Sequence, residues 1–95
     1  MENPTQHYET GSKGAFFIEN DGRRLAEMTY SRAGDKLIII DHTKVPAALR
    51  GRKVGERLVR QAIEDARRDG VAIIPLCPFA KAQFDKDPSI RDVLA

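Results

Sequence analysis

The run from Val45 to Gly55 constrains this chain more than any other segment, because it joins an apolar strand candidate (residues 37–40) to an amphipathic helix candidate. Its glycines let the backbone approach a ligand closely, and the first N–H groups of a helix have no intrahelical partner. The helix dipole favours an anion at that end, and Arg50, Arg52 and Lys53 add positive charge. The segment therefore predicts a phosphorylated ligand that is held by backbone N–H groups more than by side chains.

The spacing of this run resembles the pyrophosphate loop of the GNAT superfamily of N-acetyltransferases. That loop follows a hydrophobic residue at the end of a strand and reads Arg/Gln-x-x-Gly-x-Gly/Ala. Here Val45 lies five positions before Arg50, and Arg50 and Gly55 match the pattern. Lys53 stands where the family usually has glycine.

Two further stretches carry the same resemblance. Residues 40–43 (Ile-Asp-His-Thr) and 75–79 (Pro-Leu-Cys-Pro-Phe) are similar to a compact, single-domain bacterial GNAT-like group, and the likeness covers roughly residues 16–94. It implies acetyl-CoA as co-substrate, an amine as the unknown acceptor, and acetyl transfer between them. It also implies that the backbone near Thr43 and Val45 pairs with the pantetheine arm, as an added strand would. The implied cofactor-binding residues are Thr43, Val45, Arg50, Gly51, Arg52, Lys53, Val54 and Gly55.

Hydrophobic periodicity predicts an α/β (α+β) fold, which the resemblance narrows to a compact, abbreviated GNAT-like fold. Alternating or apolar runs predict three strands in an antiparallel meander, at residues 14–20, 25–30 and 37–40. Apolar residues at three- and four-residue intervals then predict a helix over 54–68, which Gly70 ends. A buried strand follows at 71–76, parallel to the third strand, with short helices over 80–86 and after Pro88. The resemblance implies that the third and last strands splay apart.

Size and charge limit the remaining possibilities. The 95 residues predict one domain over 13–95, which would bind acetyl-CoA, preceded by a flexible lead-in over 1–12. A chain this short gains stability from a ligand or a second copy, so a homodimer is one expected arrangement. The formal net charge of +2 and the acids interleaved with the basic loop argue against nucleic acid as a partner. A single cysteine, a polar N-terminus and the lack of long apolar runs favour a cytoplasmic protein without a membrane partner.

Cys77 and His42 are the candidate catalytic residues. Cys77 precedes Pro78 at the predicted end of the last strand, and His42 follows the third strand, so both are expected at one edge of the sheet. A thiolate near a basic loop or a protonated histidine would have a lowered pKa and be nucleophilic. His42 could act as the general base, a role that a water could also take, with Cys77 as possible nucleophile. The alternatives are a buried, inert Cys77 and a His42 that only hydrogen-bonds the backbone. No metal site is predicted.

One position departs from the family pattern. GNAT enzymes often have a tyrosine after the last strand as general acid, and Phe84 stands in that place without a hydroxyl. Three classes of function therefore stay open: an acetyltransferase, a non-catalytic acyl-CoA binder or sensor, and an interaction module. The interaction module would use the basic residues Arg50, Arg52, Lys53, Arg57 and Arg60.

Overall fold

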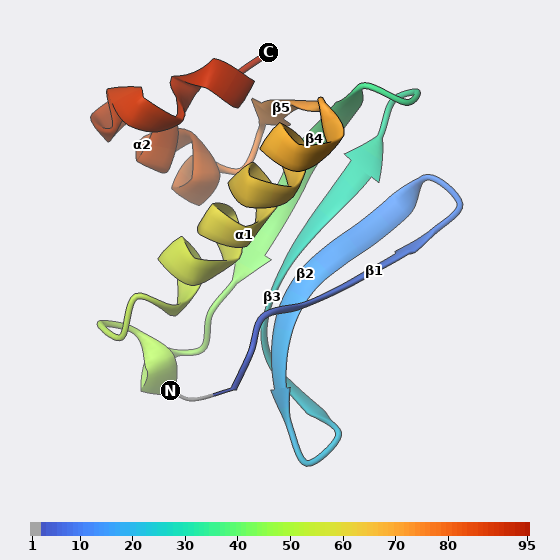
Figure 1. The fold of residues 1–95 in the computed structure, drawn as a ribbon. Helices are drawn as coiled ribbons and strands as arrows, with labels where there is room; N and C mark the ends of the chain where they lie inside the picture. Colours follow the sequence, from blue (N-terminus) through green and yellow to red (C-terminus); the bar gives the residue numbers. More distant parts are fainter. Residues whose placement is uncertain (1–2) are drawn as a thin grey trace.

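The protein forms one five-stranded sheet covered by helices on a single face (Figure 1). The computed structural model describes residues 3–95. The strands lie in the order in which they occur in the chain: β1 Gln6–Thr10, β2 Lys13–Asn20, β3 Arg23–Arg32, β4 Leu37–Lys44 and β5 Ala72–Pro75. The helices are α1 Val54–Asp69 and α2 Pro78–Lys86, with short 3-10 turns at Ala47–Leu49 and Pro88–Val93.

The strand directions confirm the expected α/β arrangement. β1 to β4 are antiparallel neighbours, and β5 pairs with β4 in parallel after the α1 crossover. The β2–β3 hairpin turns at Asp21 and Gly22, which have φ angles of 53° and 76°. Two successive positive φ angles match the right-handed twist of the strands in a tight hairpin, which explains the Asp-Gly pair at this position.

The hydrophobic core lies between the sheet and α1. Side chains alternate along a strand, so Phe16, Met28 and Ile40 from three different strands point toward the same face. The apolar stripe of α1 packs on them with Val54, Leu58, Val59, Ala62, Ile63 and Ala66. The predicted helix is thus present, one residue longer than expected, and it ends at Gly70, whose φ of 69° requires glycine or a strained residue.

The segment expected to be a flexible lead-in supplies an additional strand. Gln6–Thr10 pair with β2 along their whole length, so the antiparallel meander has four strands rather than three. Met1 and Glu2 lie outside the described residues, and the lead-in prediction stands untested there.

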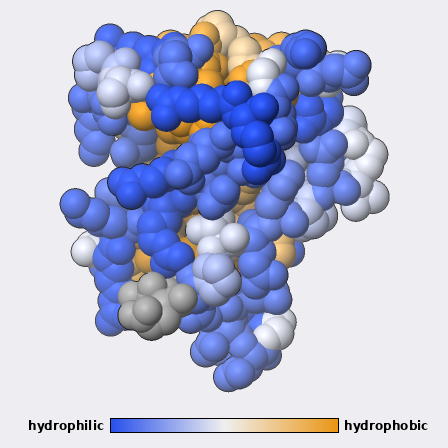
Figure 2. Space-filling model, in the orientation of Figure 1, coloured by the Kyte–Doolittle hydropathy of each residue, from blue (hydrophilic) through white to orange (hydrophobic). Residues whose placement is uncertain are grey.

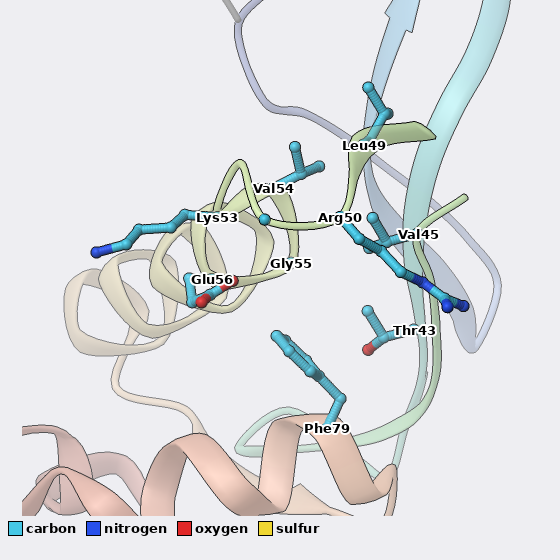
Figure 3. Close-up of a pocket in the computed structure, with 10 residues that line it drawn as sticks. Thr43, Val45, Leu49, Arg50, Lys53, Val54, Gly55, Glu56 and Phe79 are labelled. Atoms are coloured by element: carbon cyan, nitrogen blue, oxygen red, sulfur yellow. The ribbon is translucent and has the colours of Figure 1, made fainter. Parts of the chain in front are cut away.

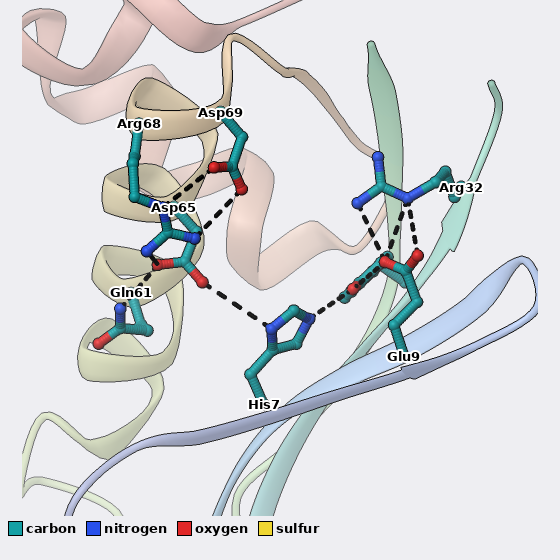
Figure 4. Close-up of polar contacts among 8 residues, drawn as sticks. His7, Glu9, Arg32, Gln61, Asp65, Arg68 and Asp69 are labelled. Atoms are coloured by element: carbon teal, nitrogen blue, oxygen red, sulfur yellow. Dashed lines mark hydrogen bonds and ion pairs between the residues drawn. The ribbon is translucent and has the colours of Figure 1, made fainter. Parts of the chain in front are cut away.

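Polar contacts and ring packing together hold β1 against the rest of the molecule, and Figure 4 shows the polar contacts. The Tyr30 hydroxyl donates to Glu9 Oε1 at 2.6 Å and lies 2.5 Å from His7 Nε2. Arg32 donates to both carboxylate oxygens of Glu9, and His7 Nδ1 lies 3.9 Å from Asp65 of α1. The His7 ring also stacks on Phe16, with centroids 4.4 Å apart. His7, to which the sequence assigned no role, therefore links β1 to both β3 and α1.

The C-terminal residues cover the outer edge of β5. Leu94 forms a parallel bridge with Ile73, and the Ala95 N–H donates to the Ile73 carbonyl at 2.9 Å. Figure 2 shows one face of the molecule, which is mainly hydrophilic. Hydrophobic residues are visible on this face mostly toward the end that carries β5 and the C-terminus. No helix among residues 3–95 is long and apolar enough to span a membrane.

Candidate functional site

A cavity of about 370 Å³ opens where β4 ends and α1 and α2 begin (Figure 3). It is lined by Thr43, Val45, Leu49, Arg50, Gly51, Lys53, Val54, Gly55, Glu56 and Phe79. The fold thus brings together every cofactor-binding residue expected from the sequence except Arg52, which is exposed and is not part of the lining. Leu49, Glu56 and Phe79 line the same cavity but were not predicted.

The loop between β4 and α1 places the N-terminus of α1, which has no side-chain cap, at this cavity. After the turn at Ala47–Leu49, Gly51 takes a φ of 83° and Lys53 a φ of 57°, and α1 begins at Val54. Lys53 provides no side-chain cap, and the Arg57 N–H is the donor to the Lys53 carbonyl, at 3.1 Å. The N–H groups of Val54, Gly55 and Glu56 precede this first bond of the helix and have no intrahelical acceptor. A helix end of this kind favours an anion.

The charged side chains around this helix end point in different directions. Figure 3 shows Arg50 extending alongside Thr43 and Val45, whereas Lys53 points away from them and from Phe79. The carboxylate of Glu56, in the first turn of α1, also borders the cavity. Of the two cations that line the cavity, Arg50 is therefore the one that lies beside the end of β4.

The two strands expected to splay apart are β4 and β5, and they separate at Ile40. The N–H groups of Leu76 and Cys77 both donate to the Ile40 carbonyl, each at 3.1 Å, and β5 then turns into α2. β4 continues to Lys44, paired with β3 but, within residues 3–95, with no strand on its other side. Such an edge presents backbone donors and acceptors to an extended ligand.

Cys77 lies at the start of α2 and contacts the cavity lining through Thr43. Its side chain is 4% exposed, and its Sγ donates to Thr43 Oγ1 at 3.2 Å. Burial acts to raise the pKa of the thiol, but the Thr43 hydroxyl and the backbone N–H groups of Ala80, Phe79 and Thr43 outweigh it. The pKa of Cys77 is lowered as a result, which favours the nucleophilic thiolate.

The structure does not bring His42 and Cys77 together, although the sequence predicts both at one edge of the sheet. A bulge shifts the register of β4, so that Tyr30 lies opposite Ile40 and Thr29 opposite His42. Paired residues share a face of the sheet, and Thr29 belongs to the face that carries no helix. The extra residue at the bulge therefore places His42 on the face of the sheet without helices. It places Thr43 on the helix-covered face, where its side chain contacts the Cys77 thiol.

Phe84 plays no part in the cavity. It is 1% exposed and belongs to the hydrophobic core beneath α2. The place of the usual tyrosine is therefore occupied by a packing residue. Among residues 3–95 there is also no group of three His, Cys, Asp or Glu side chains that could hold a metal ion.

The fold places the N-terminus of α1 beside the free edge of β4, and comparisons with known proteins identify the family to which the chain belongs. The family model of the GCN5-related N-acetyl-transferases matches residues 15–93. The chain therefore belongs to the GCN5-related N-acetyltransferase family. None of the curated proteins matches it.

A solved structure agrees with this assignment. The chain is similar to a GCN5-like protein from Staphylococcus aureus, determined by NMR in solution, with 35% sequence identity and a TM-score of 0.74. The likeness covers 100% of this chain and 91% of the other, so the complete described fold has a counterpart in a single known domain.

Proposed function

We propose that this protein binds acetyl-CoA and transfers its acetyl group to an amine. The observation that carries the proposal is the cavity at the N-terminus of α1, where a bare helix end meets the unpaired edge of β4. The helix end and Arg50 suit a diphosphate, and the strand edge suits the amide groups of a pantetheine arm. Membership in the acetyltransferase family supports the same ligand.

The adjacent thiol suggests how the acetyl group moves. In our proposal the Cys77 thiolate attacks the thioester carbonyl, a carbon–sulfur bond forms at Sγ, and the bond to the CoA sulfur breaks. CoA leaves as a thiolate. The amine then attacks the Cys77 thioester, its proton passes by way of water to the CoA thiolate, and the Cys77 thiolate is regenerated. The lowered pKa of Cys77 and its contact with Thr43 support this route over a tyrosine acid, since Phe84 carries no hydroxyl.

A mass measurement tests the proposal. Protein incubated with acetyl-CoA and then digested should carry one acetyl group on the peptide that contains Cys77, and an added amine should remove it. A Cys77→Ser variant should bind acetyl-CoA as well as the wild type, because binding rests on the loop. If millimolar acetyl-CoA changes neither the melting temperature nor the calorimetric heat, the whole proposal is wrong.

The second candidate is a non-catalytic acyl-CoA binder. The 4% exposure of Cys77 favours it, because a thiol that stays covered cannot reach a thioester. This candidate predicts binding of acetyl-CoA without label on Cys77 and without acetylation of any member of a broad amine library in single-turnover reactions.

We propose a reducing, cytoplasmic location, which suits the acetyl-transfer candidate. The only cysteine of the sequence is free and buried, and the proposed chemistry needs it as a thiol.

A further inference from the structure

The ring of Phe79 lies directly against the backbone of α1 at Gly55. A Cβ atom built on Gly55 would be 2.6 Å from Phe79 Cζ and 2.8 Å from Phe79 Cε2, closer than real contacts allow. The glycine therefore makes room for an aromatic ring as well as for a ligand. On this side the ring has no space into which it can retreat.

The same ring forms the wall of the cavity next to the thiol. Figure 3 shows Phe79 rising from α2 toward Gly55, across from Thr43. Phe79 and Thr43 both line the cavity, whereas Cys77, two residues before Phe79 and bonded to Thr43, does not. Phe79 and Thr43 therefore lie at the boundary between the cavity and the thiol.

We propose that Phe79 limits the length of the acyl chain that the site accepts, so that short acyl groups fit and longer ones are excluded. The inference rests on the proposed binding of acetyl-CoA. It adds to that proposal a residue, outside the loop, that sets which thioesters are substrates.

Two features make the ring a fixed limit rather than a movable cover. The backbone at Gly55 blocks movement of the ring toward α1. Pro78, the first residue of α2 and the residue before Phe79, has a fixed φ angle and so restrains the backbone from which the ring projects. Replacing the ring by a smaller side chain would open space beside Gly55 and Thr43. Each additional methylene buried there should strengthen binding about fourfold.

The test compares acetyl-CoA, butyryl-CoA and hexanoyl-CoA by titration calorimetry on the wild type and three variants. Phe79→Ala should raise the affinity for butyryl-CoA, which has two more methylenes than acetyl-CoA, by about fifteenfold over the wild-type ratio of the two affinities. Phe79→Leu should shift the ratio in the same direction by less. Leu49→Ala is the matched control, because it removes another apolar wall residue and should weaken all three esters equally.

The outcomes separate this inference from the function on which it rests. If acetyl-CoA binds but Phe79→Ala and Phe79→Leu leave the ratio of affinities at the wild-type value, the inference is overturned and the proposed function stands. If none of the three esters binds to the wild type, both are overturned. Should Phe79→Ala fail to fold, shown by circular dichroism, Phe79→Leu decides alone.

Discussion

Thr43 Oγ1 lies 3.2 Å from Cys77 Sγ, although 34 positions separate the two residues in the sequence. Thr43 reaches the thiol because the bulge in β4 turns it, and not His42, toward the helix-covered face. A hydroxyl at this position can accept a hydrogen bond from the thiol and donate one to the thiolate. The contact thus supports both protonation states of the only cysteine in the chain.

The first prediction follows from this contact. Thr43→Val keeps the shape of the side chain but removes the donor to the thiolate, so the pKa of Cys77 should rise above its wild-type value. The pH dependence of alkylation should therefore shift to higher pH. Thr43→Ser should retain the wild-type midpoint, and His42→Ala, on the other face, should not change it. Identical midpoints in Thr43→Val and the wild type would show that the hydroxyl does not stabilise the thiolate.

The second prediction concerns Lys53, whose φ of 57° is rare for a residue other than glycine. A left-handed conformation costs a lysine about 1–2 kcal/mol, while the larger freedom of glycine in the unfolded chain costs about 0.4–1 kcal/mol. Lys53→Gly should therefore raise the free energy of unfolding by about 0.5 kcal/mol in urea titrations. Lys44→Gly, within strand β4, should lower it. A less stable Lys53→Gly protein would mean that the lysine side chain stabilises the loop.

The sequence was sufficient for the parts of the fold that depend on apolar periodicity. The central strands, α1 and the parallel crossover all bury residues at regular intervals, so their existence was predictable. β1 was not, because its inward-facing residues His7 and Glu9 are polar and are held by Tyr30 and Arg32 from a distant strand. No local pattern in residues 6–10 reveals those partners.

The candidate site shows the same division. The loop residues were predictable because glycines and cations precede a helix in continuous sequence. The separation of His42 from Cys77 was not predictable, because a single extra residue at the bulge reverses which side chains of β4 face the core. Phe79 was also missed, since its contact with Gly55 joins two helices that are distant in the chain.

The third prediction is a loss of stability in acid. Hydrogen bonds from Arg32 and Tyr30 hold the pKa of Glu9 below its ordinary value of 4.5. The stability that these contacts provide is present above 4.5 and is lost as the pH falls through the lower, folded-state pKa. Urea midpoints should therefore fall in this acidic range, and Glu9→Gln should reduce the fall. Exposed Glu64 serves as the control, and an equal effect of Glu64→Gln would exclude a specific role of Glu9.

The fourth prediction concerns the Tyr30 hydroxyl, which is buried between His7 and Glu9. Tyr30→Phe should destabilise the protein by about 1 kcal/mol, because it removes hydrogen bonds and leaves their partners unmatched. Burial, followed by Glu9, raises the pKa of Tyr30, so the wild type should also lose stability as the pH rises above the ordinary tyrosine value of 10.0. Tyr30→Phe should lack this alkaline loss. A Tyr30→Phe protein as stable as the wild type at neutral pH would show that β1 is held without this hydroxyl.

Titration calorimetry with acetyl-CoA tests the central claim most directly, when the wild type is compared with Arg50→Ala and Arg52→Ala. Arg50 borders the cavity beside Thr43 and Val45, whereas Arg52 does not line it. The wild type should bind, Arg50→Ala should lose at least about tenfold in affinity, as expected for a charged hydrogen-bond donor, and Arg52→Ala should lose less than about twofold. Absence of binding to the folded wild type, or equal losses in the two variants, would contradict a cofactor site at the start of α1.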